Sequence, residues 1–342
     1  MTTQSRGHTG NGAGRMMTGA PTIAPVSCVI TSYNNRATIG LAIASVLCQS
    51  MPVAEIIVAD DASSDGSPEF LRRVAHAVPN LRLITRRRNL GVAANRDLAL
   101  REAGHPFVTH LDGDDLFARR KIEREWEALA GSKHDVAYSA IACLDPARPW
   151  RSVLRKPSST VSGARDAIAA RLLARRGDIP RDMLLSKALF EEAGGFDHDL
   201  RLYEDWAFKL RLAIRAGAWR NSGTLGTLYV QRAASLSSAD TAMHQSARTE
   251  VVRRSLGQLH LDPAQVQVAL AQSLGPAASA TFPELAGARA ISPVPRDHCG
   301  TAVVLDRRLA LIWAAPTISR TILDSWRCSR ALARSLEKIS RS

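Results

Sequence analysis

Short apolar runs alternate with segments of helical periodicity along the first part of the chain. The apolar runs are rich in β-branched residues, which predicts buried strands. These runs cover residues 26–31, 55–59, 81–85, 107–111 and 135–143. The helical periodicity covers residues 36–50, 67–78, 91–103 and 119–129. Strands that alternate with helices favour an α/β fold with a largely parallel, twisted sheet and helices on both faces.

The pattern continues less regularly toward the C-terminus. Residues 144–162 hold prolines and basic residues and predict an irregular loop, which could act as a lid over a ligand. After it we expect a strand at 183–185, a helix at 187–193, a turn and a helix beginning at Leu202. Three more helices are predicted beyond residue 240, at 243–259, 263–274 and 317–339.

Composition and charge narrow the class of protein. The hydrophobic content is 45%, which is typical of a globular chain, and the formal net charge of +13 favours anionic partners such as nucleotides, nucleic acid or an acidic membrane surface. No apolar run reaches the length of a membrane span. The five cysteines are scattered without a CxxC pair, so we expect neither a zinc site nor a disulfide framework, and free thiols suit a reducing cytoplasm.

Polar clusters follow three of the predicted strands. They are Thr31-Ser32-Tyr33, Asp60-Asp61 and Asp112-Gly113-Asp114-Asp115. Because the carboxyl ends of parallel strands meet at one edge of a sheet, we expect these clusters to converge on a ligand. Three carboxylates in four residues indicate a hard divalent cation, and Gly113 would let a ligand approach the backbone. The alternative is a turn in which Asp115 caps the next helix.

Four linked motifs resemble the nucleotide-sugar domain of family-2 glycosyltransferases with the GT-A fold. They are Val26 to Tyr33, Glu55 to Ser67, Asn89-Leu90-Gly91-Val92 and Leu111 to Asp115. The resemblance extends from residue 26 to about residue 237. It implies a GT-A nucleotide-binding domain over 25–239. Residues 1–24 are rich in Gly, Thr and Ser and lack the apolar core of a signal peptide, which predicts a disordered tail, and the helical runs over 240–342 predict a C-terminal helical extension outside the resemblance.

The resemblance implies a role for each donor-side residue. Thr31 and Tyr33 would flank the nucleobase, although Tyr33 could instead be a packing residue. Asp61 would accept a hydrogen bond from the base, usually uracil. Asp112 would contact the ribose or the sugar, and Asp114 would bind the diphosphate through Mg²⁺ or Mn²⁺.

The acceptor side is implied by Gly194-Gly195-Phe196-Asp197 followed by Glu204-Asp205-Trp206. In the resembling family the second carboxylate of this Glu-Asp pair is the general base, and we carry that role to Asp205. We expect Glu204 to disfavour double ionisation and so to make Asp205 more basic. The alternative is that both carboxylates complement the helix dipole. Trp206 could stack on a sugar or pack in the core.

Two arginines complete the expected site. Arg96 stands in the family's Ala-Arg-Asn-like place, where a phosphate-binding or a structural role is possible. Arg232 stands where the family often places a histidine that completes the metal shell. Arginine cannot bind a metal but pairs well with phosphate oxygens, so we expect Arg232 to assist the leaving group.

The resulting hypothesis is an inverting, metal-dependent glycosyltransferase. Its donor would be a nucleoside-diphosphate sugar, with UDP preferred, and its acceptor a saccharide or lipid-linked hydroxyl in surface or extracellular polysaccharide synthesis. Two alternatives stay open. A sugar-nucleotide nucleotidyltransferase would need a glycine-rich basic loop after the first strand, and this sequence has none there. A non-catalytic nucleic-acid-binding protein would explain the charge, but the acidic edge would repel the phosphates of the nucleic acid. We therefore expect no nucleic-acid partner.

The last predicted helix bears on the location of the protein. Its basic and apolar residues lie at amphipathic spacing, as in Arg327, Arg334, Trp326 and Leu336. Such a helix could lie on an anionic membrane surface or pack on the catalytic domain with its cations outward. We expect a cytoplasmic protein with peripheral contact to the inner face of the membrane.

Overall fold

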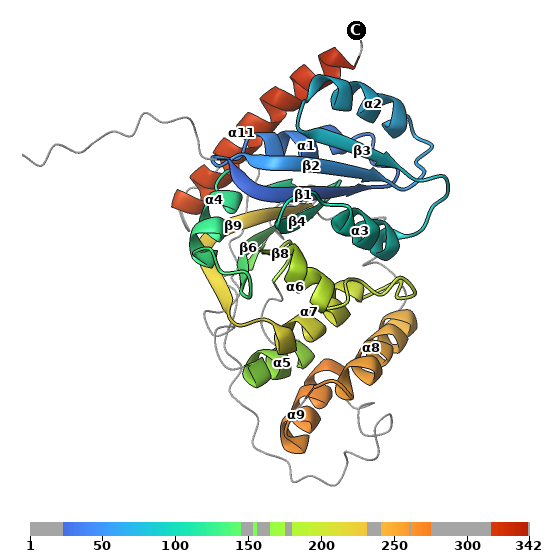
Figure 1. Ribbon diagram of the computed structural model, residues 1–342, viewed down its shortest axis with the longest axis vertical. Coiled ribbons are helices and arrows are strands. Elements are labelled where there is room, and N and C mark those ends of the chain that lie inside the picture. The colour runs from blue at the N-terminus through green and yellow to red at the C-terminus, as the bar shows by residue number, and fades with distance from the viewer. Residues whose placement is uncertain are drawn as a thin grey trace, which may run out of the picture.

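The computed structural model describes residues 23–144, 153–155, 165–174, 180–230, 241–259, 261–274 and 316–340. Within these residues, nine strands form one sheet in the order β3-β2-β1-β4-β8-β6-β9-β5, with β7 paired to β6 (Figure 1). The strands are β1 (Ala24–Ser32), β2 (Val53–Asp60), β3 (Leu81–Thr85), β4 (Phe107–Asp112), β5 (Leu116–Phe117), β6 (Val136–Leu144), β7 (Val153–Arg155), β8 (Leu184–Ser186) and β9 (Trp219–Val230). The helices are α1 (Ile39–Leu47), α2 (Ser67–Ala77), α3 (Val92–Arg101), α4 (Lys121–Leu129), α5 (Arg165–Leu173), α6 (Lys187–Glu192), α7 (Glu204–Arg215), α8 (Thr241–Leu256), α9 (Pro263–Leu274) and α11 (Pro316–Ile339).

The N-terminal half of the sheet is parallel, as the sequence pattern predicts. β1 pairs with β2 and β4, and β2 pairs with β3, all in parallel. Alternate residues of β1 enter different cores: Val29 packs with α3, α6 and α7, whereas Cys28 and Ile30 pack with α1, α2 and α4. Both faces of these strands are thus covered by helices, which explains why they read as continuous apolar runs.

The remaining half of the sheet is mixed rather than parallel. β8 runs antiparallel to β4 and β6, whereas β9 runs parallel to β6 and antiparallel to β5. The expectation of an irregular loop over 144–162 is wrong for residues 153–155, which form β7 against β6. A short strand depends on the hydrogen bonds of its neighbour, which a local sequence pattern does not reveal.

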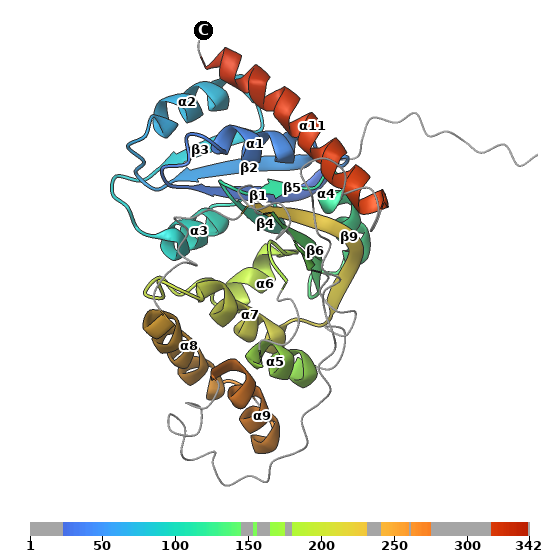
Figure 2. The ribbon, with the colours of Figure 1, turned by 180° about the vertical axis from the view of Figure 1, so that it is seen from behind.

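The C-terminal helix packs on the N-terminal half of the sheet domain, against α1 and α2. α11 lies along α1 and α2 on one face of the molecule (Figures 1 and 2). Ala333 and Leu336 are buried against that core, whereas Arg327, Arg334 and Lys338 are exposed. Of the two alternatives for this helix, packing with the cations outward is therefore the one observed. In the part of the chain that the structure describes, no helix is long and apolar enough to cross a bilayer.

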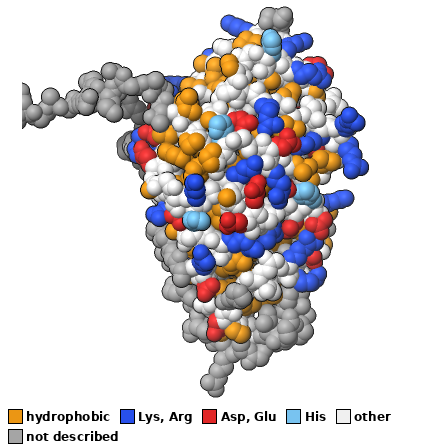
Figure 3. All heavy atoms as spheres, in the orientation of Figure 1, with side chains coloured by type: hydrophobic (Ala, Val, Ile, Leu, Met, Phe, Trp, Pro, Cys, Tyr) orange, Lys and Arg blue, Asp and Glu red, His pale blue; other side chains and the backbone are white. Residues whose placement is uncertain are grey.

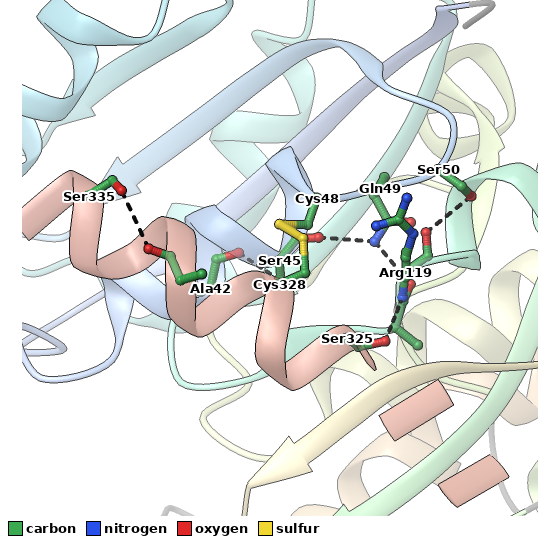
Figure 4. Close-up of a disulfide and its surroundings, with 11 residues drawn as sticks. Ala42, Ser45, Cys48, Gln49, Ser50, Arg119, Ser325, Cys328 and Ser335 are labelled. Carbon is green, nitrogen blue, oxygen red and sulfur yellow. Dashed lines mark hydrogen bonds between the residues drawn. A yellow bond between two sulfur atoms is a disulfide. The ribbon is translucent and has the colours of Figure 1, made fainter. Parts of the chain in front are cut away.

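A disulfide joins α11 to the end of α1. Cys48 and Cys328 are bonded across 280 positions of sequence (Figure 4). The backbone N–H of Arg119 donates to Ser325 Oγ close by, at 2.9 Å. The expectation that the cysteines are free is wrong for this pair, because only the return of α11 to α1 brings two remote cysteines together. Cys28 is buried and free, and its burial raises the pKa of its thiol to about 12.

The predicted domain boundaries fall mostly on parts of the chain outside the described residues. Residues 1–22 and the boundary between 239 and 240 belong to these parts. β1 begins at Ala24, the last residue of the predicted tail. The division into 25–239 and 240–342 therefore stays a prediction, and the packing of α11 on α1 shows that the extension folds back onto the domain before it.

Candidate functional site

The carboxyl ends of β1, β2 and β4 converge at one edge of the sheet. The parallel register sets Thr31 directly beside Asp112, and Thr31 Oγ1 donates to Asp112 Oδ1 at 3.1 Å. The backbone N–H of Asp61 donates to Ser32 O at 2.9 Å. Polar residues from three separate motifs are therefore hydrogen-bonded neighbours along this edge.

Asp61 anchors the loop that precedes α3. Its Oδ1 accepts the N–H of Leu90 at 2.8 Å, and its Oδ2 accepts the N–H of Gly91 at 2.9 Å. The second and third motifs thus form one structural unit. Each carboxylate oxygen has a further lone pair, so the predicted hydrogen bond from a nucleobase is compatible with these contacts.

Asp112 lies between two arginines. Arg96 Nη2 donates to its Oδ1 at 2.5 Å, and Arg181 Nη2 donates to its Oδ2 at 2.9 Å. Burial would raise the pKa of Asp112, but the charges of Arg96 and Arg181 outweigh burial and hold that pKa well below its usual range. Asp112 is therefore an anion at neutral pH.

Gly113 is required by the protein itself. A Cβ at this position would lie 2.7 Å from the Thr31 carbonyl oxygen and 3.1 Å from Ile39 Cδ1. The expectation that Gly113 makes room for a ligand is corrected here, because it is the end of β1 that approaches. The N–H of Gly113 donates to Thr31 O at 2.8 Å and fixes the start of the acidic turn.

Asp115 stabilises this turn rather than capping a helix. Its Oδ1 accepts the N–H of Val230 at 2.9 Å, and its Oδ2 lies 3.3 Å from Arg181 Nη2. Its side chain is 1% exposed, and burial raises the pKa of its carboxyl group well above the ordinary value. The capping alternative for Asp115 is therefore wrong, because its carboxylate joins β9 to the acidic motif.

Arg96 connects the donor-side and acceptor-side motifs. Its Nη2 binds Asp112 and its Nη1 donates to Glu204 Oε1 at 3.0 Å. The Arg96 side chain is only 5% exposed and stacks on Phe196, the aromatic residue of the Gly-Gly-Phe-Asp turn. Of the two roles considered for Arg96, this geometry supports the structural one, because its cation holds the two halves of the site at a fixed distance.

Helix α7 presents the Glu-Asp pair at its first turn. Tyr203, which precedes it, adopts φ +64°, a conformation that costs a non-glycine residue free energy. Its hydroxyl group pairs with His244 Nδ1 at 2.9 Å and accepts a hydrogen bond from Arg248 Nε at 3.1 Å. Both partners lie on α8, so the C-terminal extension helps to define where α7 begins.

The two carboxyl groups of this pair have pKa values shifted in opposite directions. Burial raises the pKa of Glu204, which contacts Arg96. Burial also acts to raise the pKa of Asp205, but Lys209 Nζ, 2.6 Å from Asp205 Oδ2, outweighs it and lowers that pKa. The expectation that Glu204 makes Asp205 more basic is therefore wrong, because a lysine one turn along the helix dominates. Asp205 is ionised at neutral pH, and its side chain is 40% exposed.

Tyr33 and Trp206, the two aromatic residues considered for ligand stacking, differ in their exposure. Tyr33 is 50% exposed just beyond β1, which leaves part of its ring open to a ligand. Trp206 is 1% exposed, and its Nε1 donates to Leu172 O at 2.6 Å. Trp206 is therefore a packing residue between α7 and α5, not a sugar platform.

Two site residues were not anticipated from the sequence. Lys209 follows Asp205 by four positions, a helical spacing that brings side chains together and could have identified it. Arg181 precedes β8, and the antiparallel register of β8 with β4, continued beyond Phe107–Ser186 and Val108–Leu185, sets Arg181 opposite Asp112. No local motif marks this residue. Arg232 lies outside the described residues, and so does most of the predicted lid.

The donor set of the acidic turn can be tested against a divalent cation. No group of three or more His, Cys, Asp or Glu side chains in the described ranges is arranged to hold a metal. Asp112 and Asp115 already bind guanidinium groups. Mg²⁺ is commonly held by one or two carboxylates together with substrate phosphates and water, so Asp114 would be the protein ligand of a cation that entered with a diphosphate.

Residues 27–191 match the model of glycosyl transferase family 2. The chain is similar to the Escherichia coli protein WfgD, a UDP-Glc:alpha-D-GlcNAc-diphosphoundecaprenol beta-1,3-glucosyltransferase, with 34% identity over 29% of this chain and 39% of that protein. It is also similar to the succinoglycan biosynthesis protein ExoU of Rhizobium meliloti, with 28% identity over 61% of this chain and 63% of that protein. The chain thus spans less than two thirds of the length of these relatives.

Solved structures share the fold. The crystal structure of S. aureus TarS in complex with UDP superposes with a TM-score of 0.58 over 92% of this chain and 91% of that chain, at 14% identity. The complex of TarS with UDP-GlcNAc gives a TM-score of 0.57 at 19% identity, over 75% of this chain and 73% of that chain. The sheet order, the edge built by the four motifs and the family match agree, and residues 27–191 form a domain of glycosyltransferase family 2.

Proposed function

We propose that this protein transfers a sugar from a nucleoside-diphosphate sugar to an acceptor hydroxyl with inversion at the anomeric carbon. The observation that carries the proposal is the Arg96 bridge, which joins Asp112 of the donor-side motif to Glu204 of the acceptor-side motif. A transferase needs its two substrates held next to each other, and this buried guanidinium fixes the two motifs in that relation.

On the donor side, each residue has a defined task. The exposed ring of Tyr33 stacks on the nucleobase, which has a π face available for it. Asp61 accepts a hydrogen bond from the base, with uracil as the expected partner, and Asp112 receives the ribose or the sugar. Asp114 would hold Mg²⁺ or Mn²⁺, which neutralises the charge that builds on the departing diphosphate.

On the acceptor side, Asp205 acts as the general base. As the acceptor oxygen bonds to the anomeric carbon, its proton passes to Asp205, and the bond from that carbon to the phosphate oxygen breaks with its electron pair on the nucleoside diphosphate. The lowered pKa keeps Asp205 ionised and ready to accept the proton, at the cost of some basicity. One base opposite one leaving group corresponds to a single displacement, hence to inversion.

The names of two relatives support the proposed acceptor class. WfgD is named for transfer to a diphosphoundecaprenol-linked sugar and ExoU for succinoglycan biosynthesis. We take a saccharide or lipid-linked saccharide of a surface or extracellular polysaccharide as the acceptor of this chain.

A lipid-linked acceptor would place the protein at a membrane surface. Arg327, Arg334 and Lys338 are exposed on α11, opposite its buried Ala333 and Leu336. Their spacing aligns them on one side of the helix, and cations there are attracted to the anionic cytoplasmic leaflet. The charge-reversed variant R327E/R334E/K338E should no longer sediment with acidic liposomes at low salt. Unchanged sedimentation of this variant would exclude the helix as the contact.

The face of the molecule drawn in Figure 3 lacks the continuous basic surface that nucleic acid would need. On the face drawn in Figure 3, Lys and Arg side chains alternate with Asp and Glu side chains and form no continuous stripe. A salt-sensitive shift of DNA by the protein, without turnover of any sugar nucleotide, would contradict the proposed transfer.

The decisive experiment combines binding and turnover. A thermal-shift panel of UDP, GDP, TDP and CDP, each with and without Mn²⁺, identifies the nucleotide and tests the cation. Release of that nucleotide from its sugar donors then reports turnover. Asp205→Asn should lower turnover by about 10²–10⁴-fold without loss of nucleotide binding. Asp199→Asn is the control, because Asp199 is 67% exposed and pairs with Arg254 on the surface. Full activity of Asp205→Asn would remove the base from the mechanism.

A further inference from the structure

Arg181 is a cation built into the acidic edge of the sheet. Its Nη2 lies 2.9 Å from Asp112 Oδ2 and 3.3 Å from Asp115 Oδ2, and its guanidinium group stacks on the ring of Tyr229 at 4.5 Å. Burial would lower the pKa of Arg181, but the surrounding aspartates, led by Asp182, raise it. The group is therefore permanently charged in this position.

The position of Arg181 follows from the pairing of β8 with β4. Both strands pack in the core, and their antiparallel register carries the residues before β8 toward the carboxyl end of β4. The side chain is held on three sides, by β4, by the turn after it and by β9. Its guanidinium group thus needs little ordering to bind a ligand at this edge.

Exposure distinguishes Arg181 from the other cations of the site. The side chains of Arg96 and Lys209 are 5% and 3% exposed, and their charges are committed to Asp112, Glu204 and Asp205. The side chain of Arg181 is 26% exposed. Of these three cations, Arg181 is thus the one most accessible to an incoming anion.

A diphosphate that enters this edge meets the carboxylates of Asp112 and Asp114, whose negative charges repel it. A guanidinium group at the same place offsets this repulsion and matches the geometry of phosphate oxygens. We propose that Arg181 binds the diphosphate of the sugar nucleotide, exchanging a carboxylate contact for phosphate oxygens and stabilising the leaving group as the glycosidic bond breaks. This inference rests on the proposed function and adds a residue to it.

The exchange has a second consequence. When Arg181 turns to the phosphate, a carboxylate oxygen of Asp112 or Asp115 loses its partner and becomes able to face a cation that arrives with the nucleotide. In the absence of nucleotide, Arg181 takes the place of that cation. Arg181 should therefore matter most for nucleotide binding when no divalent ion is present.

The test is calorimetric titration of the full-length chain with UDP and with uridine, each in EDTA and in Mn²⁺. Arg181→Gln should weaken UDP binding by about 10–100-fold in EDTA and by less in Mn²⁺, with uridine binding unchanged. Arg181→Lys keeps the charge without the planar fork and should give a smaller loss. Arg82→Gln is the matched control, because Arg82 also bridges two carboxylates, Glu55 and Glu102, at a site away from the acidic turn.

The outcomes separate this inference from the proposed function. If the wild-type chain binds UDP and Arg181→Gln binds it equally well, Arg181 is not a diphosphate ligand although the transferase proposal stands. An equal loss of UDP and uridine binding also overturns the inference, because it indicates general damage to the edge. If the Gln variant does not fold, Arg181→Lys decides by the same ratio of UDP to uridine binding. If the wild-type protein binds no nucleoside diphosphate, the proposed function itself is overturned.

Discussion

Lys209 sets the ionisation of the proposed base. Its ammonium group is 3% exposed and lies 2.6 Å from Asp205 Oδ2, one helical turn away. A carboxylate this close to a cation keeps its charge far into acid, so Asp205 is ready to accept a proton over the whole neutral range. The lowered pKa also makes Asp205 a weaker base, which reduces the driving force for proton transfer. Asp205 therefore depends on its position beside the acceptor hydroxyl more than on its basicity.

Lys209→Met tests this relation. Without the cation, burial dominates and the pKa of Asp205 rises, so turnover should fall at a higher pH on the acidic side of the profile. We expect the acidic limb to move upward by about one to three pH units. Lys187→Met is the control, because Lys187 is near Glu191 and outside the site. An acidic limb that stays in place would show that Asp205 does not control turnover.

Tyr33 offers a second residue-scale prediction. Because its ring is 50% exposed, removing it should leave the free energy of unfolding nearly unchanged. Tyr33→Ala should weaken nucleotide binding by about 5–30-fold through the lost stacking, whereas Tyr33→Phe should retain it. Titration with uridine measures this directly, and equal affinity of wild type and Tyr33→Ala would remove the ring from the nucleobase site.

At the scale of elements, α11 is attached by more than one kind of contact. Its apolar side covers α1, and the Arg36–Glu337 ion pair and the Cys48–Cys328 disulfide add to this. The ion pair is partly exposed and contributes little by itself. The disulfide closes a loop of 280 positions, so it restricts the unfolded chain strongly.

Reduction of this bond should lower stability. We expect Cys328→Ser, and wild type in reductant, to unfold with a free energy lower by about 2–4 kcal/mol than the oxidised protein. Denaturant unfolding with and without reductant measures the difference, and the variant should no longer respond to reductant. If oxidised and reduced wild type unfold together, the bond contributes nothing to the folded state in solution.

At the scale of the whole molecule, one sheet joins a parallel half to a mixed half. β4 is the strand at the junction, because it pairs with parallel β1 on one side and antiparallel β8 on the other. This change of direction brings Arg181 to Asp112, and Arg96 then connects the edge to α7. Two C-terminal helices pack against the two halves: α11 lies on α1, and α8 lies on α7 (Figure 2).

Removal of residues 317–342 tests whether the packing of α11 contributes to the stability of the fold. The deletion exposes the apolar surface that Ala333 and Leu336 cover, so the shortened chain should lose about 3–5 kcal/mol of stability and tend to aggregate. The charge-reversed α11 variant described above keeps the apolar side and should remain as stable as wild type. Equal unfolding of the deleted and full chains would show that α11 is not part of the folded core.

How far the site can be predicted depends on how local its signals are. Asp61, Asp112 and Asp205 stand in short motifs at the ends of predicted elements, and their neighbourhood follows from parallel strands ending at one edge. Arg181 has no such motif, since its place depends on the register of a three-residue strand. The direction of the Asp205 pKa shift also escaped prediction, because Lys209 acts through a contact formed only once α7 is wound and buried.

The sequence alone determined the parallel half of the sheet, the helices that cover it and the family-2 motifs at its edge. It could do so because apolar runs, helical periodicity and the polar residues at strand ends are each visible in a short stretch of sequence. The tertiary structure alone decided the antiparallel strands, the Cys48–Cys328 bond, the burial of Trp206 and the arginines around Asp112. Each of these joins residues far apart along the chain, and such contacts form only when the whole fold brings them together.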